Sequence, residues 1–170
     1  MQDEERVAVS WRRPDREELS AFTDELRSAS ASVPNGYTFL IHSLAYRELF
    51  AFPRKELFDL VSKLILRRKV YSAGIFAGAF RGRSFKLSLD LAEHLYRLGY
   101  WKNVLKLNEH ESQAFLYGRN VQISSEKNTF TGRLIVLSES GDVLGLGVLD
   151  QSGTQVVNLM DKGWYLRRGG

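Results

Sequence analysis

The chain has 170 residues, of which 44% are apolar and 26% charged, with only three prolines, so it can form a packed interior and is not an extended disordered chain. It contains no cysteine, which excludes a disulfide framework, a thiolate zinc site and a cysteine nucleophile. No apolar run is long enough to span a bilayer or resembles a signal peptide, and we therefore expect a cytoplasmic protein.

The first element should be a helix that begins at Asp15. Asp15 can cap the first turn, and Glu18 can reach back to the Asp15 amide in a capping box. Leu19, Phe22 and Leu26 follow at a spacing that brings them to one helical face. This face is expected to pack inward.

A hairpin and a second helix are predicted next. Aromatic and β-branched runs indicate strands at residues 37–41 and 46–50. Pro53 is a favoured opening residue for a helix, and the residues after it form an apolar stripe at helical spacing. The stripe that we expect to face inward consists of Leu57, Leu60, Val61, Leu64 and Ile65.

The first half should close with two strands and a third helix. The strands are expected at residues 70–80 and 84–87. The helix should cover residues 88–98 and end at Gly99, where a left-handed conformation favours glycine.

After Gly99 the pattern changes to short strands separated by turns, which is typical of a small barrel. A strand at 101–107 should lead to a helix that a second capping box, Asn108 to Glu111, opens and Gly118 ends. The strands that follow are predicted at residues 121–124, 133–137, 143–149, 156–159 and 164–167. We therefore predict an α+β protein with two domains, 1–99 and 100–170, the first mostly antiparallel sheet with about three helices.

The net charge of +4 is unevenly distributed. Between Arg54 and Lys86, nine lysines and arginines stand against Glu56 and Asp59, a local net charge of +7. Cations that neutralise phosphates release counterions and gain affinity, so this segment suits a polyanionic partner. A solubilising surface explains the same residues, and charge alone leaves both interpretations open.

Few residues indicate catalysis or metal binding. His110-Glu111 begins like a zinc-protease motif, but Ala114 stands where the second histidine is needed. Residues 78–84 are one residue shorter than a phosphate loop, with Arg83 in place of its lysine. We therefore predict no catalytic residue, no metal, no cofactor and no small-molecule substrate.

Two motifs in the second half resemble the PUA domain. The run from Phe115 to Val121 resembles the helix-to-strand junction of that domain, and the ending from Asp161 to Gly169 resembles its final strand. In the first half, Arg13-Pro14, Gly78-x-Phe80 and Phe85-Lys86-Leu87 are similar to the Nip-seven family of large-subunit ribosome biogenesis factors, in its archaeal-type form. This resemblance covers the chain from about Trp11 onward.

The resemblance implies an N-terminal α/β domain followed by a PUA pseudobarrel. It also implies a non-catalytic protein that binds ribosomal RNA or its precursor, works with other assembly factors in large-subunit assembly, and is nucleolar in eukaryotic relatives. PUA domains generally contact RNA with the loop after their first helix and with their last strand. The residues that correspond here are Gly118, Arg119, Asn120, Lys162, Tyr165, Arg167 and Arg168. The basic segment adds Arg81, Arg83 and Lys86, which lie at the tight hairpin between the strands expected at 70–80 and 84–87.

Charge sets a limit on the second half. Residues 101–170 carry a net charge of only +1, so we expect this half to share the RNA with the basic segment. Lys162, Arg167 and Arg168 occupy polar positions, and their joint replacement by alanine should leave the fold intact. Two alternatives stay open: a modification enzyme or subunit anchored by its PUA domain, and a protein adaptor of an RNA-processing complex.

Overall fold

The computed structural model describes residues 10–43, 45–123, 132–164 and 167. Contacts divide the chain into an N-terminal unit, residues 1–25 and 33–91, and a C-terminal unit, residues 26–32 and 92–170. Helices and strands in both units confirm the predicted α+β class. The predicted domain boundary at residue 99 stays a prediction. Within the described ranges, no helix is long and apolar enough to cross a membrane.

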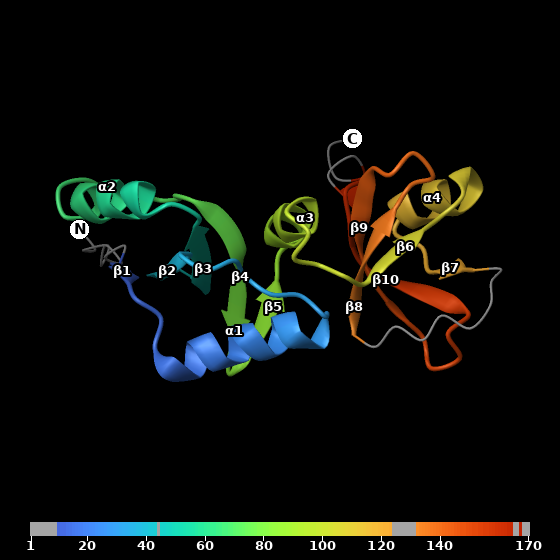
Figure 1. Ribbon diagram of the computed structural model, residues 1–170, viewed down its shortest axis with the longest axis horizontal. Coiled ribbons are helices and arrows are strands. Elements are labelled where there is room, and N and C mark those ends of the chain that lie inside the picture. Colours follow the sequence, from blue (N-terminus) through green and yellow to red (C-terminus); the bar gives the residue numbers. More distant parts are fainter. Residues whose placement is uncertain (1–9, 44, 124–131, 165–166, 168–170) are drawn as a thin grey trace, which may run out of the picture. The chain divides into compact units, whose positions relative to one another are not determined.

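The N-terminal unit is built on an antiparallel sheet whose strands lie in chain order, β1-β2-β3-β4-β5 (Figure 1). The predicted hairpin of residues 37–41 and 46–50 is confirmed as β2 and β3. β4 begins at Ile75 instead of Val70, because the preceding residues form a turn and an irregular connection. The strand bounds are Ser10–Arg12, Thr38–Ser43, Arg47–Phe52, Ile75–Arg81 and Ser84–Leu87.

Two helices cover opposite faces of this sheet (Figure 1). On one face lies α1 (Arg16–Ser28), whose Phe22 ring is 5.2 Å from the Phe39 ring and 5.3 Å from the Phe85 ring. Leu40 points to the other face, where it packs with Phe58 of α2 (Lys55–Ile65). This division follows from the alternation of side chains along a strand.

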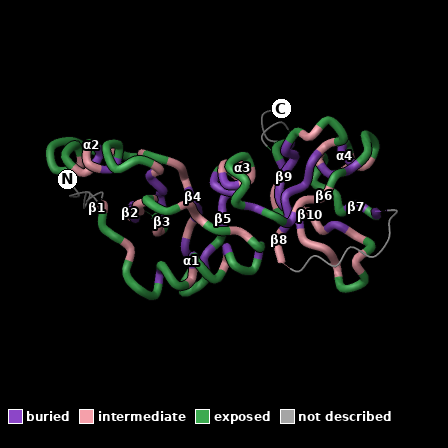
Figure 2. The backbone as a smooth tube through the Cα atoms, viewed as in Figure 1, coloured by how far each residue is buried: buried purple, intermediate pink, exposed green. Residues whose placement is uncertain are grey.

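The predicted inward stripe of α2 is only partly correct. Val61 is buried, but Leu57, Leu60 and Leu64 are 40%, 55% and 40% exposed. The side chain that the stripe omitted is Phe58, whose ring lies 5.8 Å from that of Phe52 in the sheet. The aromatic contact rotates the helix toward Phe58, and exposed residues follow its outer side (Figure 2).

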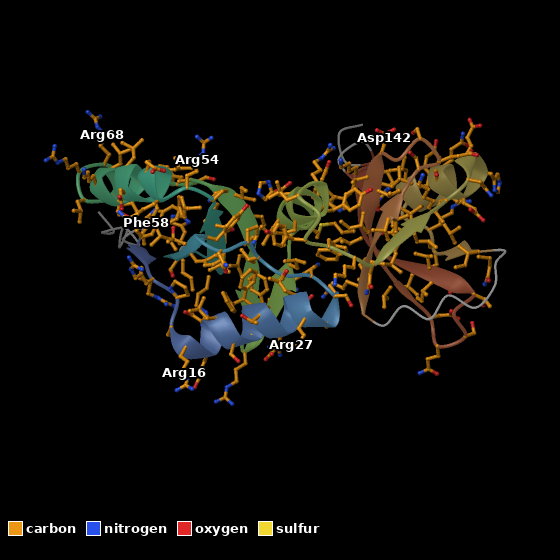
Figure 3. The ribbon with its side chains drawn as sticks, in the orientation of Figure 1. Arg16, Arg27, Arg54, Phe58, Arg68 and Asp142 are labelled. Carbon is orange, nitrogen blue, oxygen red and sulfur yellow. The ribbon has the colours of Figure 1, made fainter. Side chains whose placement is uncertain are left out.

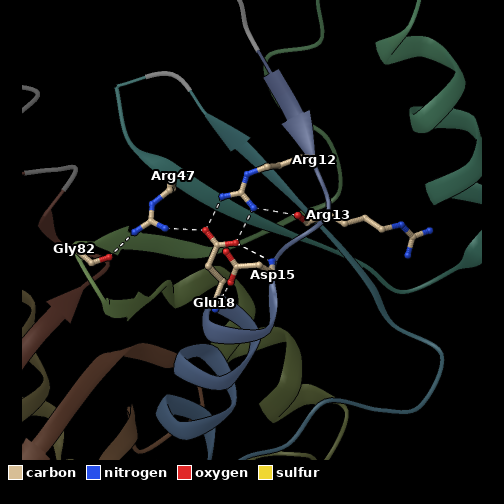
Figure 4. A network of polar contacts seen from close by, with 6 residues as sticks. All are labelled: Arg12, Arg13, Asp15, Glu18, Arg47 and Gly82. Atoms are coloured by element: carbon tan, nitrogen blue, oxygen red, sulfur yellow. Dashed lines mark hydrogen bonds and ion pairs between the residues drawn. The ribbon is translucent and has the colours of Figure 1, made fainter.

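A buried carboxylate fixes the start of α1 (Figure 4). Glu18, with a side chain only 4% exposed, accepts hydrogen bonds from the Arg12 guanidinium at 2.6 and 2.7 Å and from Arg47 at 2.8 Å. The Asp15 amide donates to Glu18 at 2.9 Å and the Glu18 amide donates to Asp15, so the predicted capping box is confirmed. The hydrogen bonds from Arg12 outweigh the effect of burial and lower the pKa of Glu18 to about 2.

The C-terminal unit carries a curled sheet in the order β6-β8-β9-β10-β7 (Figure 1). β6 (Val104–Lys106) is parallel to β8 (Arg133–Leu137), and the other pairs, which involve β9 (Val143–Leu149), β10 (Gln155–Asp161) and β7 (Val121–Gln122), are antiparallel. The core of the unit consists of Leu107, Phe115, Val121, Ile123, Leu134, Val136, Leu144 and Val156.

Helix ends in the second half agree with the sequence patterns, but the last strand does not. α3 (Leu89–Arg97) is followed by Gly99 at a φ of 79°, and Asn108 and Glu111 form the second capping box at the start of α4 (Glu109–Leu116). The strand predicted at 164–167 is wrong, since Trp164 and Arg167 are helical and the Arg167 amide donates to the Gly163 carbonyl at 3.1 Å.

We expect the Glu18→Gln variant to unfold more readily by about 2 kcal/mol, the scale of a hydrogen bond to a charged group. The folded pKa of Glu18 lies near 2 and the usual value near 4.5, so its stabilisation is present above pH 4.5 and is lost as the pH falls toward 2. Urea unfolding measured at several pH values checks this. The variant should lose less stability over that pH window than the unaltered protein does, and parallel curves would contradict the assignment.

Candidate nucleic-acid interface

The end of α4 and the end of β10 meet at a point of close backbone approach. Gly163 lies so near the Leu116 carbonyl oxygen that a side chain at residue 163 would collide with it. Gly118 adopts a φ of 78°, which ends the helix in the left-handed conformation. Two residues expected at the interface from sequence, Gly118 and Arg167, are therefore neighbours.

Arg167 joins the two segments. Its guanidinium makes a two-pronged contact with the carboxylate of Asp161, at 2.8 and 3.0 Å, and also donates to the Leu116 carbonyl. Asp161 is only 4% exposed, and the hydrogen bond to it raises the pKa of Arg167 above its ordinary value. A cation at the end of α4 also suits the negative end of the helix dipole. Arg167 is thus a structural cation, and a Cβ at residue 118 would lie 2.9 Å from its Nη2 atom.

In the loop after α4, Asn120 makes a hydrogen bond within the fold, whereas Arg119 is exposed to solvent. The Asn120 side chain accepts a hydrogen bond from the Asn158 amide at 3.0 Å, and the Asn158 side chain donates to the Phe115 carbonyl at 2.7 Å. Arg119 lies between Gly118 and Asn120 and is exposed. Its guanidinium is the free basic group of this loop, since it pairs with no residue in the described part of the chain.

Lys162 is held by a helix of the same unit. Its Nζ atom lies 2.7 Å from the Glu93 carboxylate, which also accepts from Arg97 at 2.6 Å. Burial raises the pKa of Glu93, but the bonds from Lys162 and Arg97 outweigh it and hold the pKa below its usual value. The Lys162 side chain stays 44% exposed, so it can contact an anion and Glu93 together.

The basic segment of the first half is not a single patch. One part lies along α2 and the turn after it, where Arg54 and Arg68 point into solvent (Figure 3). The other part is the β4–β5 hairpin with Arg81, Arg83 and Lys86.

Even within the hairpin the three cations diverge. Arg81 and Lys86 share one face of the sheet, because they alternate with the buried side chains of Phe80 and Phe85. Arg83 instead lines a cavity of about 320 Å³ whose wall carries the carboxylates of Asp15, Glu17, Glu18 and Asp24. Arg81 and Lys86 are therefore the better placed pair for an anion.

Two predicted interface residues, Tyr165 and Arg168, lie outside the described residues. The sequence patterns assigned no role to Asp161 and Asn158. Asp161 binds Arg167, and the Asn158 side chain donates to the Phe115 carbonyl of α4. In the sequence Asp161 only begins the motif that resembles the final PUA strand, and its burial is what marks its structural role. Over the described ranges, no group of three histidine or acidic side chains is arranged to hold a metal.

Comparison with known proteins identifies the second half. Residues 103–170 match the family described as the UPF0113 PUA domain. A UPF0113 protein of Aeropyrum pernix is 36% identical over 138 residues, which cover 79% of this chain and 77% of the relative. The crystal structure of a PUA domain from Aeropyrum pernix K1, solved with tartrate, superposes at a TM-score of 0.52 with 11% identity, and covers 93% of this chain and 90% of that one.

We expect Arg167→Ala to lower the midpoint of thermal unfolding, since it leaves the buried Asp161 carboxylate and the Leu116 carbonyl without their donor. The matched change Arg119→Ala should leave the midpoint unchanged, because Arg119 is exposed and carries no such bonds. This corrects the expectation that Arg167 can be replaced without effect on the fold. Differential scanning calorimetry of both variants measures the difference, and equal midpoints would refute the structural role of Arg167.

Proposed function

The chain belongs to the UPF0113 family, and on that premise we propose that it is a non-catalytic RNA-binding protein that acts in ribosomal RNA processing and large ribosomal subunit assembly. Its second half is a PUA domain, a fold that typically binds RNA. The observation that carries the proposal is the loop after α4, where the exposed Arg119 follows Gly118. A second exposed cation, Lys162, lies in the turn after β10.

The chemistry of this loop suits a phosphate or ribose. The Arg167 guanidinium fills the space beside Gly118, while the exposed Arg119 offers a planar fork of donors to phosphate oxygens. Lys162 adds a second cation that stays partly exposed. This half has a low net charge and few free cations. Contacts with RNA bases must therefore contribute affinity in addition to contacts with the RNA phosphates.

The ribosomal assignment rests on the resemblance of the whole chain to the Nip-seven family. The residues that support it in the first half are now seen in their structural setting. Arg13-Pro14 leads into the capping box of α1, and Gly78 and Phe85 lie on neighbouring strands. We therefore propose ribosomal RNA or its precursor as the ligand and other assembly factors as partners. Crosslinking in cells, followed by sequencing of the bound RNA, tests this, and reads spread evenly over messenger RNAs would exclude it.

The two alternatives predict different copurifying material. A modification enzyme anchored by its PUA domain would bring a methyl donor or a nucleotide with it, which mass spectrometry of the denatured protein would detect. A pure protein adaptor would bind no RNA after nuclease treatment.

The full chain should bind single-stranded RNA with an affinity that falls with salt. For about four to six phosphate contacts, log affinity against log salt should have a slope of about −3 to −4. Arg119→Gln removes one contact and should make the slope shallower by about 0.7. Arg16→Gln is the matched control, since Arg16 is also exposed and points away from the sheet on α1 (Figure 3). Fluorescence-anisotropy titrations at several salt concentrations measure the affinity and its slope. An affinity that does not change with salt would reject the electrostatic account.

A separate experiment tests whether the β4–β5 hairpin also contacts the RNA. Arg81 and Lys86 changed together to glutamine should weaken binding and lower the slope by about 1.4 if both contact phosphates. Arg83→Gln should have a smaller effect, because Arg83 faces the carboxylates of the α1 cavity. Unchanged affinity in the double variant would exclude the β4–β5 hairpin from the RNA site.

A further inference from the structure

A row of exposed leucines runs along α2. Leu57, Leu60 and Leu64 stand at the spacing i, i+3, i+7, which aligns their side chains on one side of the helix. Each of them is 40% or more exposed, and Figure 2 shows the exposed side of this helix. Single exposed leucines are common, but a continuous apolar row is typical of an interaction site. We call these three residues the leucine ridge.

The core of the N-terminal unit does not require the leucine ridge. The neighbouring row of α2, formed by Phe58, Val61 and Ile65, makes the contacts with the apolar cluster of the sheet. Phe58 and Val61 are buried, whereas the leucines beside them remain in contact with water. A surface that covered the leucines would therefore gain hydrophobic stabilisation that the fold leaves unused.

Arginines border the ridge at both ends. Arg54 is the N-cap of α2, where it makes no side-chain cap bond and points into solvent (Figure 3). A cation opposes the helix dipole at this end, so helix stability does not explain Arg54. At the other end, the amides of Arg67 and Arg68 donate to the Leu64 carbonyl at 3.0 and 2.9 Å, which holds both beside the last leucine. Across the residues that the structure describes, none of these three arginines makes an ion pair.

The acidic residues of this segment do not balance its cations. Asp59 is paired with Lys55 at 2.5 Å, which leaves Glu56 as the other carboxylate. Residues 54–69 contain six lysines and arginines against these two acidic residues, a local net charge of +4. The surface of α2 is therefore an apolar row in a positive field, and its complement is an apolar row with carboxylates beside it.

We propose that the leucine ridge is the docking site for an acidic amphipathic helix of a protein partner. The apolar side chains of that helix cover the leucines, and its carboxylates pair with Arg54, Arg67 and Arg68. Amphipathic helices are recognised in this way through anchors at i, i+3 or i+4 and i+7. The inference goes beyond the proposed function, since it rests on the surface of α2 alone and holds whether or not the chain binds RNA.

Other occupants fit this surface less well. RNA stacks its bases on aromatic rings, which the leucine ridge does not offer. A second copy of the chain docked through the same surface would bring two positive fields together. A membrane takes up a helix whose apolar face is free, whereas Phe58 and Val61 already use part of that face of α2.

A synthetic helix tests the ridge directly. The peptide consists of leucine, alanine and glutamate with a leucine at every third or fourth position, and a scrambled peptide of the same composition lacks the row. Leu60→Ser in the full chain should weaken binding of the ordered peptide about tenfold, the scale of burying part of one leucine. Leu98→Ser is the matched control, because Leu98 is 49% exposed but belongs to the C-terminal unit. Fluorescence anisotropy of the labelled peptides measures the affinities.

The charges and the fold are checked with the same peptide. Arg67→Gln together with Arg68→Gln should weaken binding and make it less sensitive to salt, whereas Leu60→Ser should leave the salt sensitivity unchanged. The midpoint of thermal unfolding of Leu60→Ser should stay near that of Leu98→Ser. A midpoint far below it would show that Leu60 supports the fold, and the docking site would lose its basis.

A photocrosslinker identifies the occupant in cells. With Leu60 replaced by p-benzoylphenylalanine, the crosslinked peptide sequenced by mass spectrometry should be acidic and carry apolar residues at helical spacing. The control places the same group at Tyr46, which is 62% exposed in the same unit. A crosslink to RNA, to lipid or to a second copy of this chain would overturn the inference, and so would a yield no higher than at Tyr46.

The results keep this inference apart from the proposed function. If the unaltered protein binds the ordered peptide no more tightly than the scrambled one, the docking site is wrong, and RNA binding is unaffected. If the protein binds the ordered peptide but no RNA at any salt concentration, the proposed function fails and the docking site stands. Leu60→Ser should lose the peptide and bind RNA as the unaltered protein does.

Discussion

The contact of Arg167 with Asp161 and the Leu116 carbonyl is the interaction on which the candidate interface depends. It ties the last turn of α4 to the end of β10, two segments 45 residues apart in sequence when counted from Leu116 to Asp161. A buried carboxylate is costly unless it is paired, so Asp161 and Arg167 require each other. Glu18 has the corresponding role in the N-terminal unit, where one buried carboxylate gathers Arg12 and Arg47 at the start of α1. In both places an acidic residue sets the position of the arginines, and the exposed surface follows from it.

Local interactions made much of the fold predictable. The two capping boxes and the left-handed Gly99 depend on residues within a few positions of one another, and all three are confirmed. The errors occurred where distant contacts decide. Phe58 displaced the expected stripe of α2 because an aromatic partner in the sheet attracts it, which helical periodicity does not encode. Trp164 and Arg167 are helical, and Arg167 binds back to the end of α4 instead of lying along a sheet.

Sequence likeness named two segments that the fold brings together at Gly118 and Arg167, but it did not predict the roles of their residues. A likeness to other PUA sequences located Gly118 to Asn120 and the C-terminal segment. It gave no means to separate Arg119, which is free, from Arg167, which is bound within the fold. Burial and pairing make that distinction, and both are properties of the folded chain.

The short strands at the borders of both sheets have a further consequence. The first sheet is bordered by β1 and β5, of three and four residues, and the second by β6 and β7, of three and two. Such borders present few unpaired amides and carbonyls, and β5 and β6 each add an exposed lysine, Lys86 and Lys106. Short, charged border strands are poor templates for strand addition by another molecule. At these borders the described part of the chain therefore resists self-association by strand pairing.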